Sequence, residues 1–93
     1  RMSIQAGNDT LKITVRLFAS YREKAGKSEV DMILPQKSTV GFLASLMAER
    51  YPSITQQPDT LVVAVNHEYR DHFHTLDDGD EVALIPPVSG GLS

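Results

Sequence analysis

The sequence contains no cysteine and no tryptophan, and it has only three tyrosines and three phenylalanines in 93 residues. Without cysteine this sequence offers no disulfide, no thiolate nucleophile and no cysteine-ligated zinc site. Such a composition fits a reducing compartment, so we expect a cytoplasmic protein. No apolar run approaches the ~20 residues that cross a bilayer, and we therefore expect no membrane partner.

Positive charge is also scarce, since nine Lys and Arg stand against twelve Asp and Glu, giving a formal net charge of -3 at pH 7. The basic residues are scattered, whereas a surface that binds nucleic acid needs them clustered. We expect no nucleic acid partner. A chain of 93 residues buries somewhat over ~60% of the surface that its unfolded form exposes, which predicts one modest core without a deep catalytic pocket.

Four segments have the pattern of strands. Apolar and polar residues alternate over positions 11–17 and again over 30–34, which predicts two paired strands. The apolar run Leu61–Val65 predicts a strand covered on both faces, followed by a turn at 66–69. Residues 82–85 predict a last strand, which Pro86 and Pro87 end because proline cannot donate to a ladder.

One segment has the pattern of a full helix, with apolar residues at helical spacing between positions 40 and 51. Ser38 or Thr39 can cap its start and Pro52 ends it; residues 20–25 predict a shorter helical turn before Gly26. The order strand, strand, helix, strand, strand predicts an α+β domain of the β-grasp, ubiquitin-like type, a mixed sheet of four to five strands with one main helix. We expect a flexible leader or cloning remnant at 1–10, the domain at 11–87 and a flexible tail at 88–93.

Side chains suited to catalysis are few. His67, His72 and His74 are close in the sequence, but no cysteine or ordered carboxylate completes a ligand set, so we expect surface histidines and no metal. The acidic run at 77–81 fits a tight turn around Gly79 better than a calcium loop, whose ligands spread over about twelve residues. We expect no bound cofactor and no self-contained enzyme.

The pair Gly90-Gly91 follows the last predicted strand, where glycine adds nothing to a core and loses entropy when ordered. It can be a frayed end or a linker remnant. In the functional interpretation, residues without side chains thread into a partner's active site, and the main-chain carboxylate of Gly91 reacts there. A partner that consumes ATP could activate this carboxylate as an acyl-adenylate, which a sulfur donor converts to a thiocarboxylate.

The segment 15–91 resembles the small, sulfur-carrying subunits of molybdopterin synthase, the MoaD family of the ubiquitin-like MoaD/ThiS superfamily. The residues that carry the resemblance are 15–19 with Arg22, Glu23 and Gly26, then Val65-Asn66, 76–82 and 86–91. The resemblance implies that a ubiquitin-activating-enzyme-like adenylyltransferase of the MoeB type uses ATP to adenylate Gly91. It also implies that the resulting thiocarboxylate donates sulfur to cyclic pyranopterin monophosphate inside the large synthase subunit, which holds the catalytic side chains.

Strand parity predicts a docking face for that large subunit. If the apolar residues of 11–17 and 82–84 point inward, Phe18 and Ile85 point to the other face of the sheet. With Tyr69 on the neighbouring turn, they would form an exposed apolar patch beside the tail. Pro86, Pro87, Val88 and Ser89 complete the predicted partner-binding residues. The alternative is that Phe18, Tyr69 and Ile85 cap a second small core.

One feature departs from the family pattern: Leu92 and Ser93 follow Gly91, whereas the family's carriers end at the second glycine. We expect that these two residues are removed by a protease, belong to a longer fusion or were added in cloning. Three other functions remain open. They are a thiamine-type sulfur carrier, a protein modifier and a non-catalytic ubiquitin-like interaction module.

Overall fold

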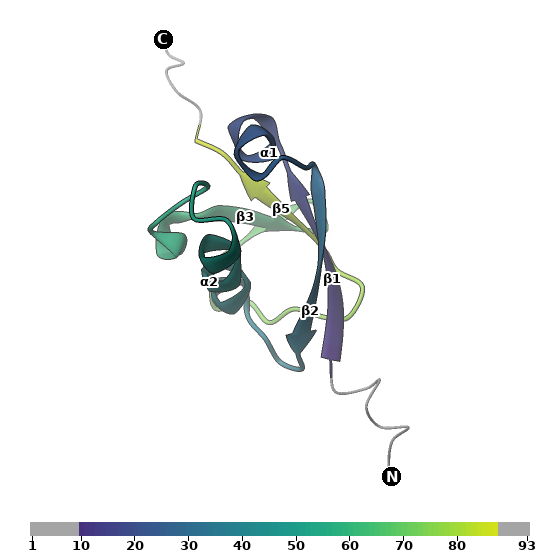
Figure 1. Ribbon diagram of the computed structural model, residues 1–93. Coiled ribbons are helices and arrows are strands. Elements are labelled where there is room, and N and C mark those ends of the chain that lie inside the picture. The colour runs from purple at the N-terminus through teal and green to yellow at the C-terminus, as the bar shows by residue number, and fades with distance from the viewer. Residues whose placement is uncertain (1–9, 88–93) are drawn as a thin grey trace.

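The computed structural model describes residues 10–87, which form a five-stranded mixed sheet with helix α2 across one face (Figure 1). The elements are β1 (Thr10–Leu17), α1 (Ala19–Ala25), β2 (Glu29–Pro35), α2 (Val40–Arg50), the 3-10 turn η2 (Pro58–Thr60), β3 (Val62–Val65), β4 (Glu68–Arg70) and β5 (Glu81–Ile85). The strand order is β2-β1-β5-β3-β4, in which β1 and β5 are parallel and the other neighbours are antiparallel. This topology confirms the predicted β-grasp fold.

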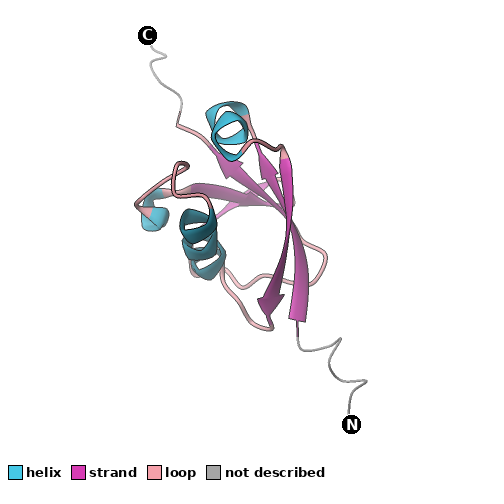
Figure 2. Cartoon of the chain, viewed as in Figure 1, coloured by secondary structure: helices cyan, strands magenta, loops and turns pink. Residues whose placement is uncertain are grey.

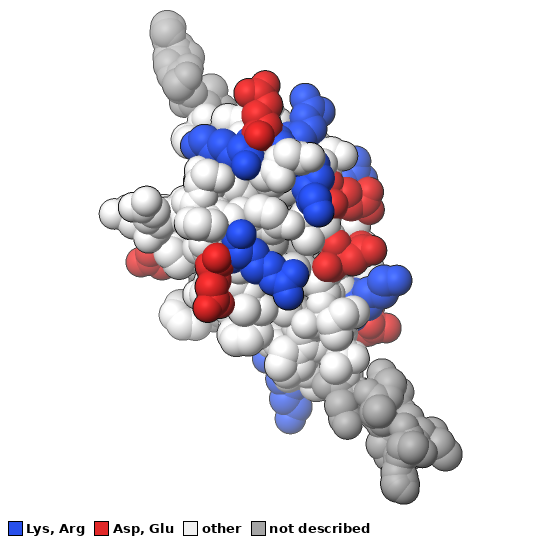
Figure 3. Space-filling view, viewed as in Figure 1, with Lys and Arg blue, Asp and Glu red and all other residues white. Residues whose placement is uncertain are grey.

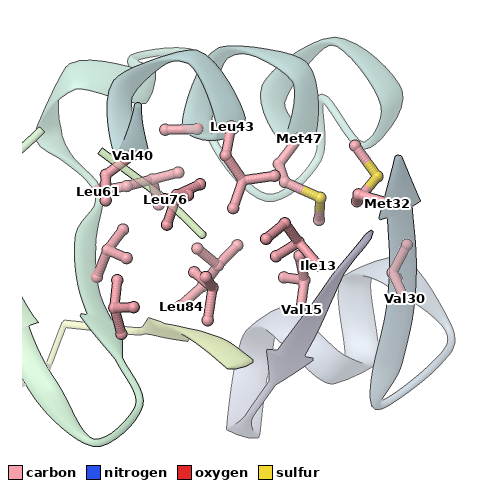
Figure 4. Close-up of a cluster of buried hydrophobic side chains, with 14 of the residues drawn as sticks. Ile13, Val15, Val30, Met32, Val40, Leu43, Met47, Leu61, Leu76 and Leu84 are labelled. Carbon is pink, nitrogen blue, oxygen red and sulfur yellow. The ribbon is translucent and has the colours of Figure 1, made fainter. Parts of the chain in front are cut away.

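The core lies between α2 and the face of the sheet that it covers, which we call the inner face. Figure 4 shows Leu43 and Met47 of α2 directed toward Ile13, Val15 and Leu84 on the central strands. All five side chains are buried, as are Leu11, Leu17 and Val82, so the predicted inward set of β1 and β5 is confirmed. Removing their apolar surface from water is the main force that holds α2 on the sheet.

Helix α2 begins and ends where the sequence predicts. The Thr39 hydroxyl oxygen accepts a hydrogen bond from the Phe42 N–H at 3.2 Å, so Thr39 is the N-cap. Ser38, the other candidate, donates its hydroxyl to the Pro35 carbonyl at 2.7 Å instead. The last turn closes at Tyr51, directly before Pro52.

Three local predictions need correction. The segment before Gly26 is a seven-residue helix, α1, rather than a short turn, although Gly26 ends it as predicted, with a φ of 78°. The predicted turn at 66–69 is confined to Asn66 and His67, whose φ values of 50° and 75° let Glu68 pair with Val65 and start β4. Strand β1 begins at Thr10, one residue before the predicted domain boundary.

The prediction that Leu61–Val65 is covered on both faces is wrong at Val62, which is 50% exposed. The reason is that α2 covers only the inner face, toward which Val63 and Val65 point. Figure 2 shows the single layer of strands beneath α2, with α1 at the end of the sheet where β1 finishes. Because β5 runs parallel to β1, it finishes at this same end.

Charged side chains of both signs are interspersed over the face seen in Figure 3, where Lys and Arg lie among Asp and Glu. Neither described helix has the length and apolar character that would let it cross a membrane.

A polar network joins the β3–β4 turn to the turn before β5. The Asn66 amide nitrogen donates to Asp80 Oδ1 at 2.9 Å, and the Glu81 N–H donates to Asn66 Oδ1 at 3.0 Å. Asp80 is buried, and its Oδ2 accepts the Asp77 N–H at 2.8 Å. Two of the segments that carry the family resemblance, Val65-Asn66 and 76–82, are therefore in direct contact.

This network gives a stability prediction. Asn66→Ala should lower the free energy of unfolding by about 2–4 kcal/mol, because two hydrogen bonds are lost near a buried carboxylate and alanine is strained at positive φ. Asn66→Gly loses the same bonds without that strain and should retain about 1 kcal/mol more. Urea unfolding measures both. Equal losses of unfolding free energy in the two variants would contradict the strain assigned to alanine at positive φ. No loss in either variant would contradict the contribution of the hydrogen-bond network to stability.

Candidate functional site

The face of the sheet opposite α2, which we call the outer face, carries the side chains that parity assigned to it. Arg16 pairs with Ala83, Ala83 with Ala64, and Ala64 with Tyr69, so these four form one row across β1, β5, β3 and β4. Ile85 pairs with Val62 in the next row. Phe18 extends β1 toward this second row, since its backbone is still extended, with φ -126° and ψ 155°.

Phe18 and Ile85 line a common hollow of about 260 Å³, which we call the outer groove. Its lining residues are Arg16, Phe18, Ala64, His67, Glu81, Ala83 and Ile85. The hollow exists because two small side chains, Ala64 and Ala83, face each other across β3 and β5. Phe18 is 41% exposed, as predicted. Ile85, for which parity also predicts exposure, is half-buried because Val62 lies directly beside it.

One side of the outer groove is charged. Arg16 Nη1 lies 2.9 Å from Glu81 Oε2, and the Arg16 Cζ atom lies 5.9 Å from the centroid of the Phe18 ring. His67 Nε2 lies 3.8 Å from Glu81 Oε1. Because Arg16 and Glu81 are exposed, their ion pair adds little stability. They place a fixed charge pattern beside an apolar hollow, which favours orientation of a bound partner.

Tyr69, the third predicted patch residue, lies on the outer face but not in the outer groove. It is 71% exposed and lines a neighbouring hollow together with Val62 and Phe73. Sequence reasoning did not single out Val62 or Phe73 as surface residues. The alternation of β3 could have identified Val62, whereas Phe73 lies in a stretch without periodicity.

The C-terminal tail begins beside these hollows. Pro86 and Pro87, which directly follow β5, line a hollow of about 450 Å³ together with Tyr21, Thr60, Val62 and Ile85. Burial raises the pKa of the Tyr21 phenol above its ordinary value of 10.0. The remaining predicted site residues, Val88, Ser89, Gly90 and Gly91, lie outside the described residues, as do Leu92 and Ser93.

Two of the three histidines connect loop segments to their neighbours, His72 through its ring and His74 through its backbone. His72 Nε2 lies 2.8 Å from the Leu61 carbonyl oxygen, at the edge of β3 that β4 leaves uncovered. The His74 carbonyl accepts the Val40 N–H at the start of α2. Among the described residues, the outer face is suited to binding a protein surface, because exposed apolar groups lie there beside charged ones.

Residues 15–91 match the ThiS family. The molybdopterin synthase sulfur carrier subunit of Dictyostelium discoideum is 38% identical over 80 residues, covering 83% of this chain and 93% of the relative. The subunit of the same name from Chlamydomonas reinhardtii is 37% identical over 83 residues, covering 87% and 100%.

Among solved structures, SAMP1 of Haloferax volcanii, the small archaeal modifier protein 1, superposes with a TM-score of 0.75 at 30% identity and covers 86% of this chain and 99% of its own. The family match runs from β1 to the predicted tail, and each of the two relatives covers most of the sequence. The chain therefore belongs to the ThiS family and, within it, to the group of molybdopterin synthase sulfur carrier subunits.

Proposed function

We propose that this chain carries sulfur for molybdopterin synthase on the main-chain carboxyl group of Gly91. The observation that supports this most directly is the family match, which continues beyond β5 through residue 91. A purely structural domain needs no such continuation, because β5 already ends at Ile85. The relatives named as sulfur carrier subunits support the same function.

The proposed chemistry uses the tail and two partners. In a ubiquitin-activating-enzyme-like adenylyltransferase, a Gly91 carboxylate oxygen attacks the α-phosphate of ATP, and pyrophosphate leaves. Hydrosulfide from the sulfur donor then attacks the acyl carbon and gives up its proton, the bond from that carbon to the AMP oxygen breaks, and the departure of AMP leaves a thiocarboxylate. The large synthase subunit receives this tail and supplies the catalytic side chains that pass sulfur to cyclic pyranopterin monophosphate, which takes one sulfur from each of two carriers.

The outer groove is the proposed docking site for the large subunit. A threaded tail alone buries too little area for a stable complex, so the folded domain must add contacts. Phe18 and Ile85 supply apolar contact at the end of the sheet from which Pro86 and Pro87 lead into the tail. A partner seated on the outer face would therefore receive the tail, including Val88 and Ser89, directly beside its docking surface.

A second candidate function is attachment to other proteins as a modifier, which the likeness to SAMP1 favours. Both functions begin with activation of the same carboxyl group. They differ in the acceptor, because a modifier forms isopeptide bonds with lysine side chains. A thiamine-type carrier would instead deliver its sulfur to thiazole synthase.

The test is a reconstituted reaction with a chain that ends at Gly91, the adenylyltransferase, ATP, a sulfur donor, the large subunit and cyclic pyranopterin monophosphate. We expect the chain to gain the mass of one sulfur in place of one oxygen and molybdopterin to form only when ATP is present. An unchanged mass after incubation would contradict sulfur loading. Lysine adducts without molybdopterin would favour the modifier.

A further inference from the structure

Phe73 is the most exposed large apolar side chain within residues 10–87, at 89% of its full accessibility. It lies between β4 and Thr75, which forms an isolated β-bridge with Thr39, the N-cap of α2. It lines an open hollow of about 640 Å³ with Val62 and Tyr69. Exposed phenylalanine is costly in water, and an aromatic beside other exposed apolar groups usually marks an interface.

The backbone that carries Phe73 is fixed on both sides. The Phe73 N–H donates to Asp71 Oδ1 at 2.9 Å, and the His74 N–H donates to the Asp71 carbonyl at 3.2 Å. These bonds close a tight turn around the aromatic residue. The backbone of the turn is therefore ordered, although the Phe73 ring itself is almost fully exposed to solvent.

The turn is also attached to the body of the domain. The His72 carbonyl accepts the Gly41 N–H of α2 at 2.9 Å, and the His72 ring bonds the edge of β3. A Cβ atom on Gly41 would lie 3.2 Å from the His72 carbonyl oxygen, so the turn and the helix are in close contact. Such anchoring lowers the entropy that binding must remove, which is the usual property of an interface anchor.

The surface around Phe73 is continuous with the outer groove. Val62 lines both the Phe73 hollow and the hollow at the base of the tail. Ile85 lines that second hollow and the outer groove. An apolar path therefore runs from Phe18 through Ile85 and Val62 to Phe73 without leaving the end of the sheet at which the tail begins.

We propose that Phe73 is a second anchor for the partner that docks in the outer groove, the large synthase subunit. This inference rests on the proposed function. The ring inserts into an apolar recess of the partner. Asp59, Asp71 and Arg70 border the hollow on this chain, and Arg70 is paired with Glu68, so basic groups flank the recess of the partner. The interface thus extends from β1 across β5 and β3 to the turn after β4.

Titration calorimetry with the large subunit tests the proposal on the full chain. Phe73→Ala should weaken the Kd about 10- to 100-fold, the range of aromatic anchors, whereas Phe73→Leu should stay within about 3-fold of the unsubstituted chain. Phe18→Ala reports on the outer groove itself and should also weaken binding about 10- to 100-fold. Ile33→Ala is the matched control, because Ile33 is 62% exposed on β2, at the opposite edge of the sheet, and it should leave the Kd unchanged.

The outcomes separate the two proposals. Loss of affinity in Phe18→Ala with none in Phe73→Ala overturns the second anchor and leaves the proposed function standing. No binding by the unsubstituted chain, either in full or ending at Gly91, overturns both. Two other results also overturn the assignment of Phe73 to the large subunit. One is that Phe73→Ala weakens binding to the adenylyltransferase but not to the large subunit. The other is a dimer of this chain in sedimentation that depends on Phe73. Equal urea unfolding of all variants is expected because the substituted side chains are exposed.

Discussion

A chain that ends at Gly91 should acquire a thiocarboxylate, whereas a chain that continues through Leu92 and Ser93 should not. In the longer chain the Gly91 carbonyl carbon is bound in an amide to Leu92, and an amide oxygen is a far weaker nucleophile toward ATP than a carboxylate. The Leu92 side chain would also have to pass a channel shaped for glycine.

The measurement compares the two chains with adenylyltransferase, ATP and a sulfur donor, following pyrophosphate release and intact mass. Only the shorter chain should release pyrophosphate and gain sulfur. Both chains share residues 10–87, so both should unfold at the same urea concentration. Equal sulfur loading of the two, with Leu92 and Ser93 still attached, would show that activation does not need a free glycine carboxylate.

Gly91→Val in a chain that ends at residue 91 should reduce molybdopterin formation by at least about 100-fold, the loss expected when a reacting group is displaced by roughly 1 Å. A branched side chain beside the reacting carbonyl cannot be accommodated where only a Cβ-free residue fits. Molybdopterin formation by Gly91→Ala should lie between that of the unsubstituted chain and that of Gly91→Val. The reconstituted reaction measures product, and pyrophosphate release reports separately on adenylation.

Stability serves as the control for this substitution. Residue 91 lies beyond the end of β5 at Ile85, so the free energy of unfolding should not change. Normal molybdopterin formation by Gly91→Val would remove Gly91 from the chemistry. A loss of product with normal adenylation would place the requirement for glycine in the large subunit rather than in the activating enzyme.

The elements that periodicity predicts well are those with one fully buried face. Strand β1 and helix α2 each carry an unbroken apolar pattern, and Thr39 and Pro52 mark the ends of α2. Strand β4 is different, since its three residues are all exposed and leave no pattern. It forms because Asn66 and His67 adopt positive φ, a property of the turn that composition alone does not reveal.

The docking face could be predicted in part, because the alternation of side chains along a strand fixes the face on which each one lies. Parity places Phe18 and Ile85 correctly, because a strand side chain can point only to one face or the other. Parity does not reveal that Ala64 and Ala83 meet to form a hollow, since that depends on which strands are neighbours. Nor does it reveal Phe73, whose exposure follows from hydrogen bonds of the surrounding turn to Asp71 and α2.

The outer groove is assembled from opposite ends of the described chain. Its charged side joins Arg16 and Glu81, which are 65 positions apart in the sequence. Pairings of such long range form late in folding, because closing a long loop costs entropy before any contact compensates it. On the ribosome, β1 must therefore wait for β5, and the groove appears only after nearly the whole domain has been synthesised. A partner that binds through the groove would thus select carriers whose folding is complete and ignore nascent or partly unfolded chains.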